Sequence, residues 1–351
     1  MTRYTHETIE PLLEVFIIRG HPLNITEIGN WVTSQQPEFT QRLRELVNTN
    51  SYTKVHPNVD QCMQILDGYA EDIGLTTEII KQRHRRYIGG NGKGPRVVLS
   101  THIDTVHPPD SSFKTYTALE DGFVTGPGVG DMKGGLLMAL YTLKAMSELL
   151  PDYDLHMTVG ADEEIGSPSI RDWYQSGAMQ ADYCICMEPG FPQAELGPNQ
   201  PYGVVARRKG SATINFEVEG VASHSGGAYE KGLSAVKAMA HKIVDLYAIN
   251  DFDKGVNINV GVVEGGEAMN TIAPSAKAAV NLRYWTTIDG ETAVEQVREI
   301  VHRQHEHNAV LKHYERISDF DVSIFLPPME RNERNEYMID VVLEEAERLG
   351  Q

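Results

Sequence analysis

Cysteines and long apolar segments are both scarce in this sequence. Its 351 residues include three cysteines, Cys62, Cys184 and Cys186, too few for a disulfide framework, so we expect a protein of a reducing compartment. No apolar run approaches the roughly 18 residues that a membrane-spanning helix needs. The first 20 residues have acids before their short apolar patch and no small-residue cleavage site, which argues against a signal peptide. A cytoplasmic enzyme or binding protein is expected.

Positive charge is also in short supply. The chain has 31 Lys and Arg residues against 49 Asp and Glu residues, a formal net charge of −18. This charge repels phosphate backbones and anionic lipids, so neither nucleic acid nor a membrane is expected as the main partner. Hydrophobic residues (41%) and charged residues (23%) occur in the proportions of ordinary globular proteins, and the length is sufficient for two domains.

The first 206 residues alternate between helix-like and strand-like patterns. Apolar residues recur at helical spacing over 36–50 and 57–73, and residues 131–150 are apolar on nearly all sides, as in a buried helix. Apolar runs that end in polar residues predict strands in "PRVVLSTHIDTV", "DLHMTVGADEE" and "ADYCICMEPG". This alternation predicts an α/β domain with a mostly parallel sheet and helices on both faces.

After about residue 206 the pattern changes to half-exposed strands. The stretches "GSATINFEVEG" and "KAAVNLRYWT" alternate apolar and polar residues, and each is followed by a helical stretch. We predict a small α+β sandwich, open on one face of its sheet, inserted at residues 207–316. Residues 333–350 again resemble a helix of the first kind, so a discontinuous domain of residues 1–206 and 317–351 is expected around the insertion.

The stretch "STHIDTV" carries the first candidate site residues. His102 and Asp104 are two residues apart at the end of a predicted strand, so both point to the same face. The pair fits a metal-ligating histidine whose tautomer a carboxylate fixes, and it also fits an ordinary hydrogen-bonded pair. Taken alone, the pair leaves both readings open.

Further acids stand at the start or the end of the other apolar segments. Asp131, after "GPGVG", is either a helix N-cap or a ligand, and its loop matches neither the dinucleotide fingerprint nor the P-loop. The residues Asp162–Glu164 follow one predicted strand, and Glu188 follows another. Cys184 and Cys186 share one face of that last strand, and we predict them to be core residues rather than metal ligands.

These acids are expected to converge. In an open α/β sheet, ligands bind where the carboxyl ends of the strands meet. Three strand ends and one strand-to-helix loop deliver an imidazole and several carboxylates to that edge: His102, Asp104, Asp131, Asp162–Glu164 and Glu188. Such donors suit zinc, cobalt or manganese, and a bridging aspartate permits two ions roughly 3.5–4 Å apart.

The assembled motifs resemble those of the M20 family of co-catalytic zinc metallopeptidases, most closely its glutamate carboxypeptidases. The resemblance covers roughly residues 40–340 in the family's order. The stretches that carry it are "STHIDTV", "GPGVGDMKGGLLMAL", "ADEEIGSPS", "EPG", "EGVASHSGGAYEKGLSAV" and "GGEAMNTIAPSAKAAVNLRY". It implies a hydrolase that cleaves an amide bond next to a free carboxylate, acting as a carboxypeptidase or an N-acyl amino acid deacylase.

The resemblance also implies a role for each acid. His102 and Glu188 would hold one zinc ion, Glu164 would hold the second, and Asp131 would bridge the two. By the same resemblance, Asp104 would orient His102 and Glu163 would be the general base. The family further leads us to expect a cis peptide bond between Asp131 and Met132.

The inserted domain corresponds to the family's lid and dimerisation domain. A homodimer is therefore implied, with His224 reaching across it to stabilise the oxyanion. Asn270 and Arg283 match residues that bind the substrate, a peptide or an N-acyl amino acid. Without the resemblance, His224 is a surface-loop histidine and Arg283 a charged residue on an exposed sheet face.

One departure concerns the second metal. The family supplies it with a further histidine from near its C-terminus, and here no histidine follows His313. The resemblance therefore predicts a weaker metal site at Glu164, with one or two zinc ions per subunit. A catalytically silent relative, or a shortened chain, that acts as a small-molecule binder or a dimer partner is the alternative to an active hydrolase.

Overall fold

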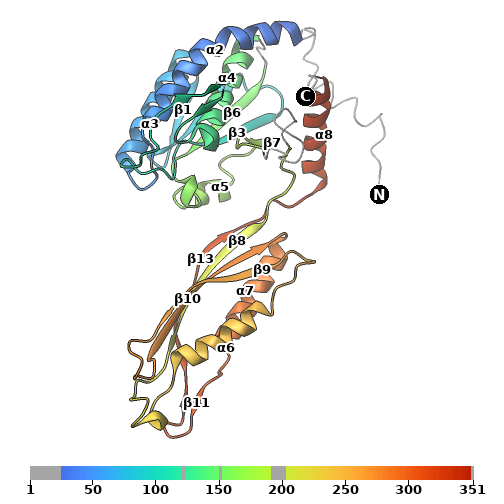
Figure 1. The fold of residues 1–351 in the computed structure, drawn as a ribbon. Coiled ribbons are helices and arrows are strands. Elements are labelled where there is room, and N and C mark those ends of the chain that lie inside the picture. Colours follow the sequence, from blue (N-terminus) through green and yellow to red (C-terminus); the bar gives the residue numbers. More distant parts are fainter. Residues whose placement is uncertain (1–24, 121–122, 150–151, 191–202, 349–351) are drawn as a thin grey trace. The chain divides into compact units, whose positions relative to one another are not determined.

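The computed structural model describes residues 25–120, 123–149, 152–190 and 203–348. The chain divides into two compact units, residues 1–189 and 190–351, and each is described by itself (Figure 1). The sequence-based expectation about a signal peptide concerns the first 20 residues, which lie outside the described residues. Among the described residues, no helix combines the length and the apolarity that crossing a membrane requires.

The first unit contains a five-stranded mixed sheet with the order β1-β2-β6-β3-β7. Parallel pairing, as predicted, joins β3 to β6 and to β7, whereas β1, β2 and β6 pair antiparallel. The bounds are β1 Thr76–Ile80, β2 His84–Gly90, β3 Arg96–His102, β6 Asp154–Gly160 and β7 Tyr183–Cys186. The parallel strands β6, β3 and β7 therefore end at the same edge of the sheet.

Helices supply most of the core on one face of this sheet. The helices of the first unit are α2 Ile25–Asn48, α3 His56–Asp72, α4 Gly134–Leu149 and the short α5 Arg171–Gln175. Leu46 of α2, Met63 of α3 and Leu136 of α4 are completely or almost completely buried and share a core with Met157 of β6. Each such side chain contributes roughly 1.5–3 kcal/mol by leaving water. The α/β class that the sequence predicted is confirmed.

The two cysteines of β7 correct the sequence-based prediction. Cys184 and Cys186 were expected in the core, but both are exposed. Ile185, between them, packs against the core, so the cysteines occupy the opposite face of an edge strand. The apolar composition of this strand predicted that it is buried. The sequence does not show that β7 is at the edge of the sheet, with only β3 as a partner among the described strands.

The loop before α4 is anchored through a buried lysine. Residues Val129–Lys133 form a wide turn, and the expected cis peptide bond between Asp131 and Met132 is present. Lys133 is fully buried, and its ammonium donates to the carbonyl oxygens of Leu46 (2.7 Å) and Thr49 (3.0 Å). It thereby satisfies carbonyl groups at the C-terminal end of α2, which has no basic residue in its last turn.

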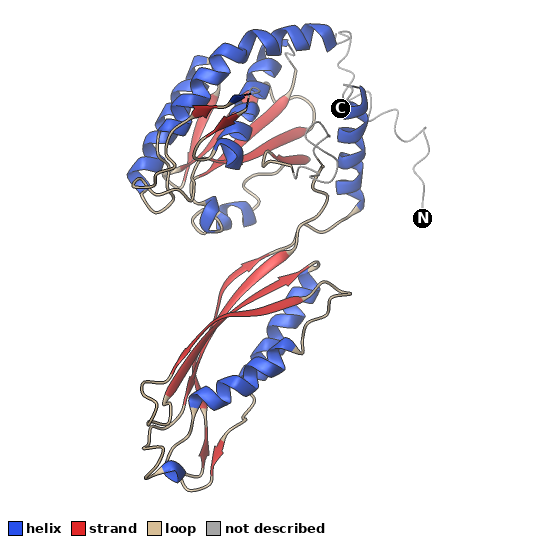
Figure 2. Ribbon diagram, in the orientation of Figure 1, coloured by secondary structure: helices blue, strands red, loops and turns tan. Residues whose placement is uncertain are grey.

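The second unit is an antiparallel sheet covered by helices on one face (Figure 2). Its strands, in the order β13-β8-β10-β9, are β8 Gly210–Glu219, β9 Asn257–Gly265, β10 Ser275–Tyr284 and β13 Arg316–Leu326. The covering helices are α6 Ala235–Tyr247 and α7 Thr287–His302. Phe216, Leu282 and Val297 are central to its core. The predicted α+β sandwich with one open sheet face is confirmed, while the division at 206 and 316 remains a prediction.

Smaller elements complete the described chain. The pairs β4 Thr117–Ala118 with β5 Val124–Thr125, and β11 His307–Asn308 with β12 His313–Tyr314, form two-stranded sheets. The last helix is α8 Glu333–Arg348, where the sequence predicted one.

Gly135 permits a close approach between α4 and the segment that follows β7. A Cβ atom at this position would lie 2.0 Å from the carbonyl oxygen of Met187, the residue that precedes Glu188. The backbone that carries Glu188 is therefore in direct contact with the first turn of α4.

Gly135→Ala should push these two segments apart. We expect the free energy of unfolding in urea to fall by roughly 1–3 kcal/mol, the usual effect of overpacking. Gly130→Ala is the matched control, because a Cβ atom there would meet no heavy atom within 4 Å. Equal stability of the two variants would show that the close approach is unimportant.

Candidate metal centre

His102 lies at the centre of the predicted site. It is the last residue of β3 and is 1% exposed. Its Nδ1 is 3.1 Å from the carbonyl oxygen of Asp104 and 3.4 Å from the Oδ1 atom of the same residue. The other ring nitrogen, Nε2, points toward carboxylates from other loops.

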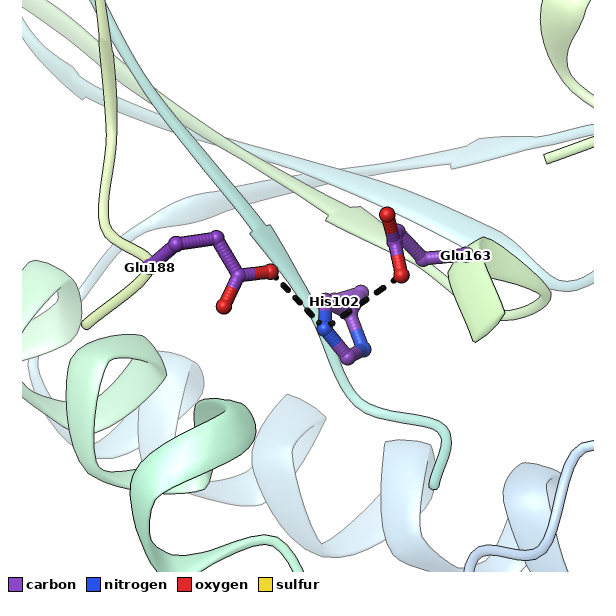
Figure 3. A group of neighbouring side chains, drawn as sticks. All are labelled: His102, Glu163 and Glu188. Atoms are coloured by element: carbon purple, nitrogen blue, oxygen red, sulfur yellow. Dashed lines mark ion pairs between the residues drawn. The ribbon is translucent and has the colours of Figure 1, made fainter. Parts of the chain in front are cut away.

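Three carboxylates surround His102 Nε2. The Oδ1 atom of Asp131 and the Oε1 atom of Glu188 each lie 3.0 Å from it, and Glu163 Oε2 lies at 3.7 Å. Figure 3 shows Glu163 and Glu188 reaching the ring from opposite sides. One ring nitrogen carries at most one proton and cannot satisfy three anionic groups. A divalent cation between these donors would satisfy all of them.

Two overlapping sets of donor atoms could hold a metal ion. His102, Glu163 and Glu188 form one set, and His102, Asp131 and Glu164 form the other, with all donor atoms of a set within 4.8 Å of one another. Imidazole nitrogen and carboxylate oxygen are donors that zinc, cobalt and manganese accept. The residues therefore fit the predicted ions.

Asp131 takes part in this cluster rather than in capping a helix. Its Oδ1 atom contacts His102 Nε2, and α4 begins only three residues later, at Gly134. The sequence left two alternatives for Asp131, a helix N-cap and a ligand. The contact with His102 favours the ligand, whose role in binding a metal remains a prediction.

The acids destabilise one another's charged forms. Burial, and next the charge of Asp131, raises the pKa of Glu164 to about 7. The pKa of Glu163 is also raised, chiefly by burial. Burial alone would lower the pKa of His102, but hydrogen bonds with Asp104, Asp131 and Glu188 raise it to about 12. Adding a cation would relieve this repulsion.

Asp104 holds more than the imidazole. Its side chain has no exposed surface, and it accepts hydrogen bonds from the backbone N–H groups of Glu163 (3.1 Å) and Glu164 (3.2 Å). The hydroxyl of Thr53 donates to its Oδ2 atom at 2.7 Å. Sequence reasoning assigned Asp104 only to His102 and did not find Thr53, whose loop "NTNSYT" has no recognisable motif.

The predicted residues of the second unit fall into two places. His224 and Asn270 lie on adjacent loops, since the N–H of Ser225 donates to the carbonyl of Asn270 at 2.9 Å. Arg283 lies near the far end of β10, eight residues after its first residue, Ser275, so roughly 26 Å separate the two ends. Arg283 donates through Nε to Asn281 at 3.0 Å, and its side chain is exposed.

Comparison with known proteins connects this geometry to a family. The family description "Peptidase dimerisation domain" of the M20 peptidases matches residues 206–309. Carboxypeptidase G2 of Pseudomonas sp. (strain RS-16) is 28% identical over 279 residues, which are 76% of this chain and 65% of that protein. Succinyl-diaminopimelate desuccinylase of Magnetococcus marinus is 26% identical over 74% of this chain and 71% of its own length. The chain thus spans less than two thirds of the length of carboxypeptidase G2.

Solved structures agree on the fold. Aminopeptidase PepT from Bacillus cereus is similar with a TM-score of 0.72 and 20% sequence identity, over 90% of this chain and 83% of that one. The resemblance to the M20 peptidases, first seen in the sequence motifs, is confirmed by the matched dimerisation domain and by the sequence relatives.

The raised pKa of His102 predicts how the metal-free protein responds to pH. A histidine whose pKa rises from 6.5 to about 12 on folding stabilises the folded state fully below pH 6.5, and loses that contribution as pH rises toward 12. Urea unfolding of metal-free protein should therefore show stability falling as pH rises above about 6.5. His102→Asn should flatten this dependence, and an unchanged slope in that variant would contradict the assignment.

Proposed function

We propose that this chain is a metal-dependent amide hydrolase that cleaves an amide bond next to a free carboxylate. The observation that carries the proposal is the buried Nε2 atom of His102, which faces carboxylates from three separate loops. These loops meet at the carboxyl ends of parallel strands, where α/β enzymes bind their ligands. The relatives named above as a carboxypeptidase and a desuccinylase support a peptide or an N-acyl amino acid as substrate.

The proposed ligands are distributed over two ions. His102 and Glu188 would hold one zinc ion, Glu164 would hold the other, and Asp131 would bridge them, with cobalt or manganese as alternatives. All four residues belong to the two donor sets described above. Bound zinc would make a water molecule more acidic and polarise the substrate carbonyl. Asp104 keeps the His102 ring oriented through Nδ1, so that Nε2 remains directed toward the ions.

Glu163 is the proposed general base. Its backbone is fixed by Asp104, while its side chain is half-exposed and can reach an incoming water molecule. Burial of the carboxyl raises its pKa, which brings it closer to neutrality and improves it as a proton acceptor. Glu163 takes the proton of the attacking water and passes it to the leaving amine.

Glu163→Gln and Glu164→Gln should separate proton transfer from metal binding. Glu163→Gln should keep the metal content and lower the hydrolysis rate by about 10²–10⁴-fold, because the amide cannot accept the proton. Glu164→Gln should lose bound metal. Metal per chain is measured by elemental analysis, and turnover on a panel of N-acyl amino acids and dipeptides.

Two results would count against this mechanism. Hydrolysis by Glu163→Gln at the wild-type rate would contradict the role of Glu163 as the general base. Wild-type protein without bound metal and without turnover on the whole panel would favour the silent, ligand-binding relative.

His224 is the proposed stabiliser of the oxyanion. Its Nδ1 atom accepts hydrogen bonds from the backbone N–H groups of Gly226 and Gly227, both at 3.1 Å. The proton of the neutral ring is therefore on Nε2, where no described residue accepts it and it can be donated to a developing negative charge. Arg283 is proposed to bind the substrate carboxylate through its guanidinium group.

A homodimer would reconcile the positions of these residues. Arg283 lies roughly 26 Å along β10 from the first residue of that strand, Ser275, and the chain reaches Ser275 from the Asn270 loop. One small substrate therefore cannot contact His224, Asn270 and Arg283 in one chain. We therefore propose that His224 of the partner subunit acts at each site. The dimerisation domain matched at residues 206–309 supports this arrangement.

Mixing two inactive variants tests whether His224 acts in the partner's site. A heterodimer of His224→Ala with Glu163→Gln would contain one intact site, built from unmodified Glu163 and the unmodified His224 of the partner subunit. Co-refolded mixtures should regain about one quarter of wild-type activity, since half of the dimers are mixed and each has one working site. If His224 acts within its own subunit, the mixture stays inactive.

A further inference from the structure

The loop that carries Glu163 and Glu164 is held by a side chain of β2 and by a side chain of the segment that follows β3. It leaves β6, which lies between β2 and β3 in the sheet. On the β3 side, Asp104 accepts the N–H groups of Glu163 and Glu164. The β2 side contributes His84, a residue outside both predicted sets of metal donors.

His84 is completely buried and has a partner on each ring nitrogen. Its Nδ1 atom accepts the backbone N–H of Ala161 at 3.1 Å, so the proton of the ring is on Nε2. That nitrogen lies 2.7 Å from the hydroxyl oxygen of Ser169, to which it donates. Burial lowers the pKa of His84, which keeps Nδ1 free to accept.

Asp162 closes the same loop on itself. Its Oδ2 atom accepts the backbone N–H of Ser169 at 2.9 Å, and its carbonyl oxygen accepts the N–H of Ser167 at 2.9 Å. Asp162 Oδ1 is buried, lies 4.0 Å from His84 Nε2, and has no hydrogen-bond partner among the described residues. Asp162 therefore faces His84 and Ser169, whereas Glu163 and Glu164 belong to the groups of candidate metal donors around His102.

From this geometry we infer that His84 is a positioning residue for the Glu163–Glu164 loop, acting with Asp162 and Ser169. His84 fixes the N–H of Ala161 at the start of the loop and the side chain of Ser169 at its end. Together with Asp104, His84 fixes the backbone positions of Glu163 and Glu164, from which both side chains extend. The inference deepens the proposed function, because those side chains are the proposed base and a proposed metal ligand.

Hydrogen exchange of the metal-free full chain tests directly whether His84 holds the Glu163–Glu164 loop. His84→Leu removes both ring partners, so the amides of residues 161–166 should exchange faster than in wild type. His84→Asn retains an oxygen near the Nδ1 position and should restore much of the protection. His156→Leu is the matched control, since His156 is also buried and pairs with a carboxylate, Asp154 at 2.9 Å, on the opposite end of β6. Unchanged exchange in His84→Leu would overturn the inference.

Zinc titration against a chromophoric chelator tests the consequence for the site. His84→Leu should weaken zinc binding by about 10- to 100-fold, as removal of groups that orient metal ligands usually does, while His156→Leu should bind as wild type does. Equal zinc affinity in His84→Leu and wild type would overturn the positioning role. If wild-type protein binds no zinc, the proposed function fails, and the exchange measurement still decides whether His84 holds the loop.

Discussion

The buried carboxylate of Asp104 connects parts of this site that lie far apart in the sequence. It accepts hydrogen bonds from Thr53 and from the backbone of Glu163 and Glu164, and its Oδ1 atom lies 3.4 Å from His102. A fully buried charge is tolerated only when its partners compensate for the lost hydration, and Asp104 has such partners on both oxygens. Because those partners belong to the end of β3 and to two separate loops, removing this one carboxylate would release all three segments.

The density of acids at the strand ends has a consequence for the chemistry. Asp131, Glu163, Glu164 and Glu188 lie around one imidazole. Burial, and next the repulsion by Asp131, Asp104 and Glu163, raises the pKa of Glu164 to about 7. Without a cation, protons are the means of reducing this repulsion. A divalent ion competes with those protons for the same oxygens, so metal binding should be accompanied by proton release.

The second unit differs from the first in how it would contribute to catalysis. Its core is an independent sheet with two helices, and its candidate residues lie at opposite ends of β10. The tautomer of His224 is fixed locally by two glycine N–H groups, so this donor is ready before any substrate arrives. Such preorganisation is what an oxyanion site requires. A dimer would bring it to a substrate whose carboxylate lies near Arg283.

Local pattern in the chain was enough to predict the α/β class, the α+β second part and the convergence of His102, Asp131, Glu163–Glu164 and Glu188. His102, Glu163–Glu164 and Glu188 stand where apolar runs end, and parallel strands bring such ends to one edge, whereas Asp131 comes from the loop before a buried helix. Thr53 and His84 could not be found this way, because they lie 51 and 77 residues from Asp104 and Ala161, whose groups they bind. The error over Cys184 and Cys186 has the same origin. Alternation along a strand shows which side chains share a face, but only the order of strands in the folded sheet decides which strand is an edge and which loops a side chain holds.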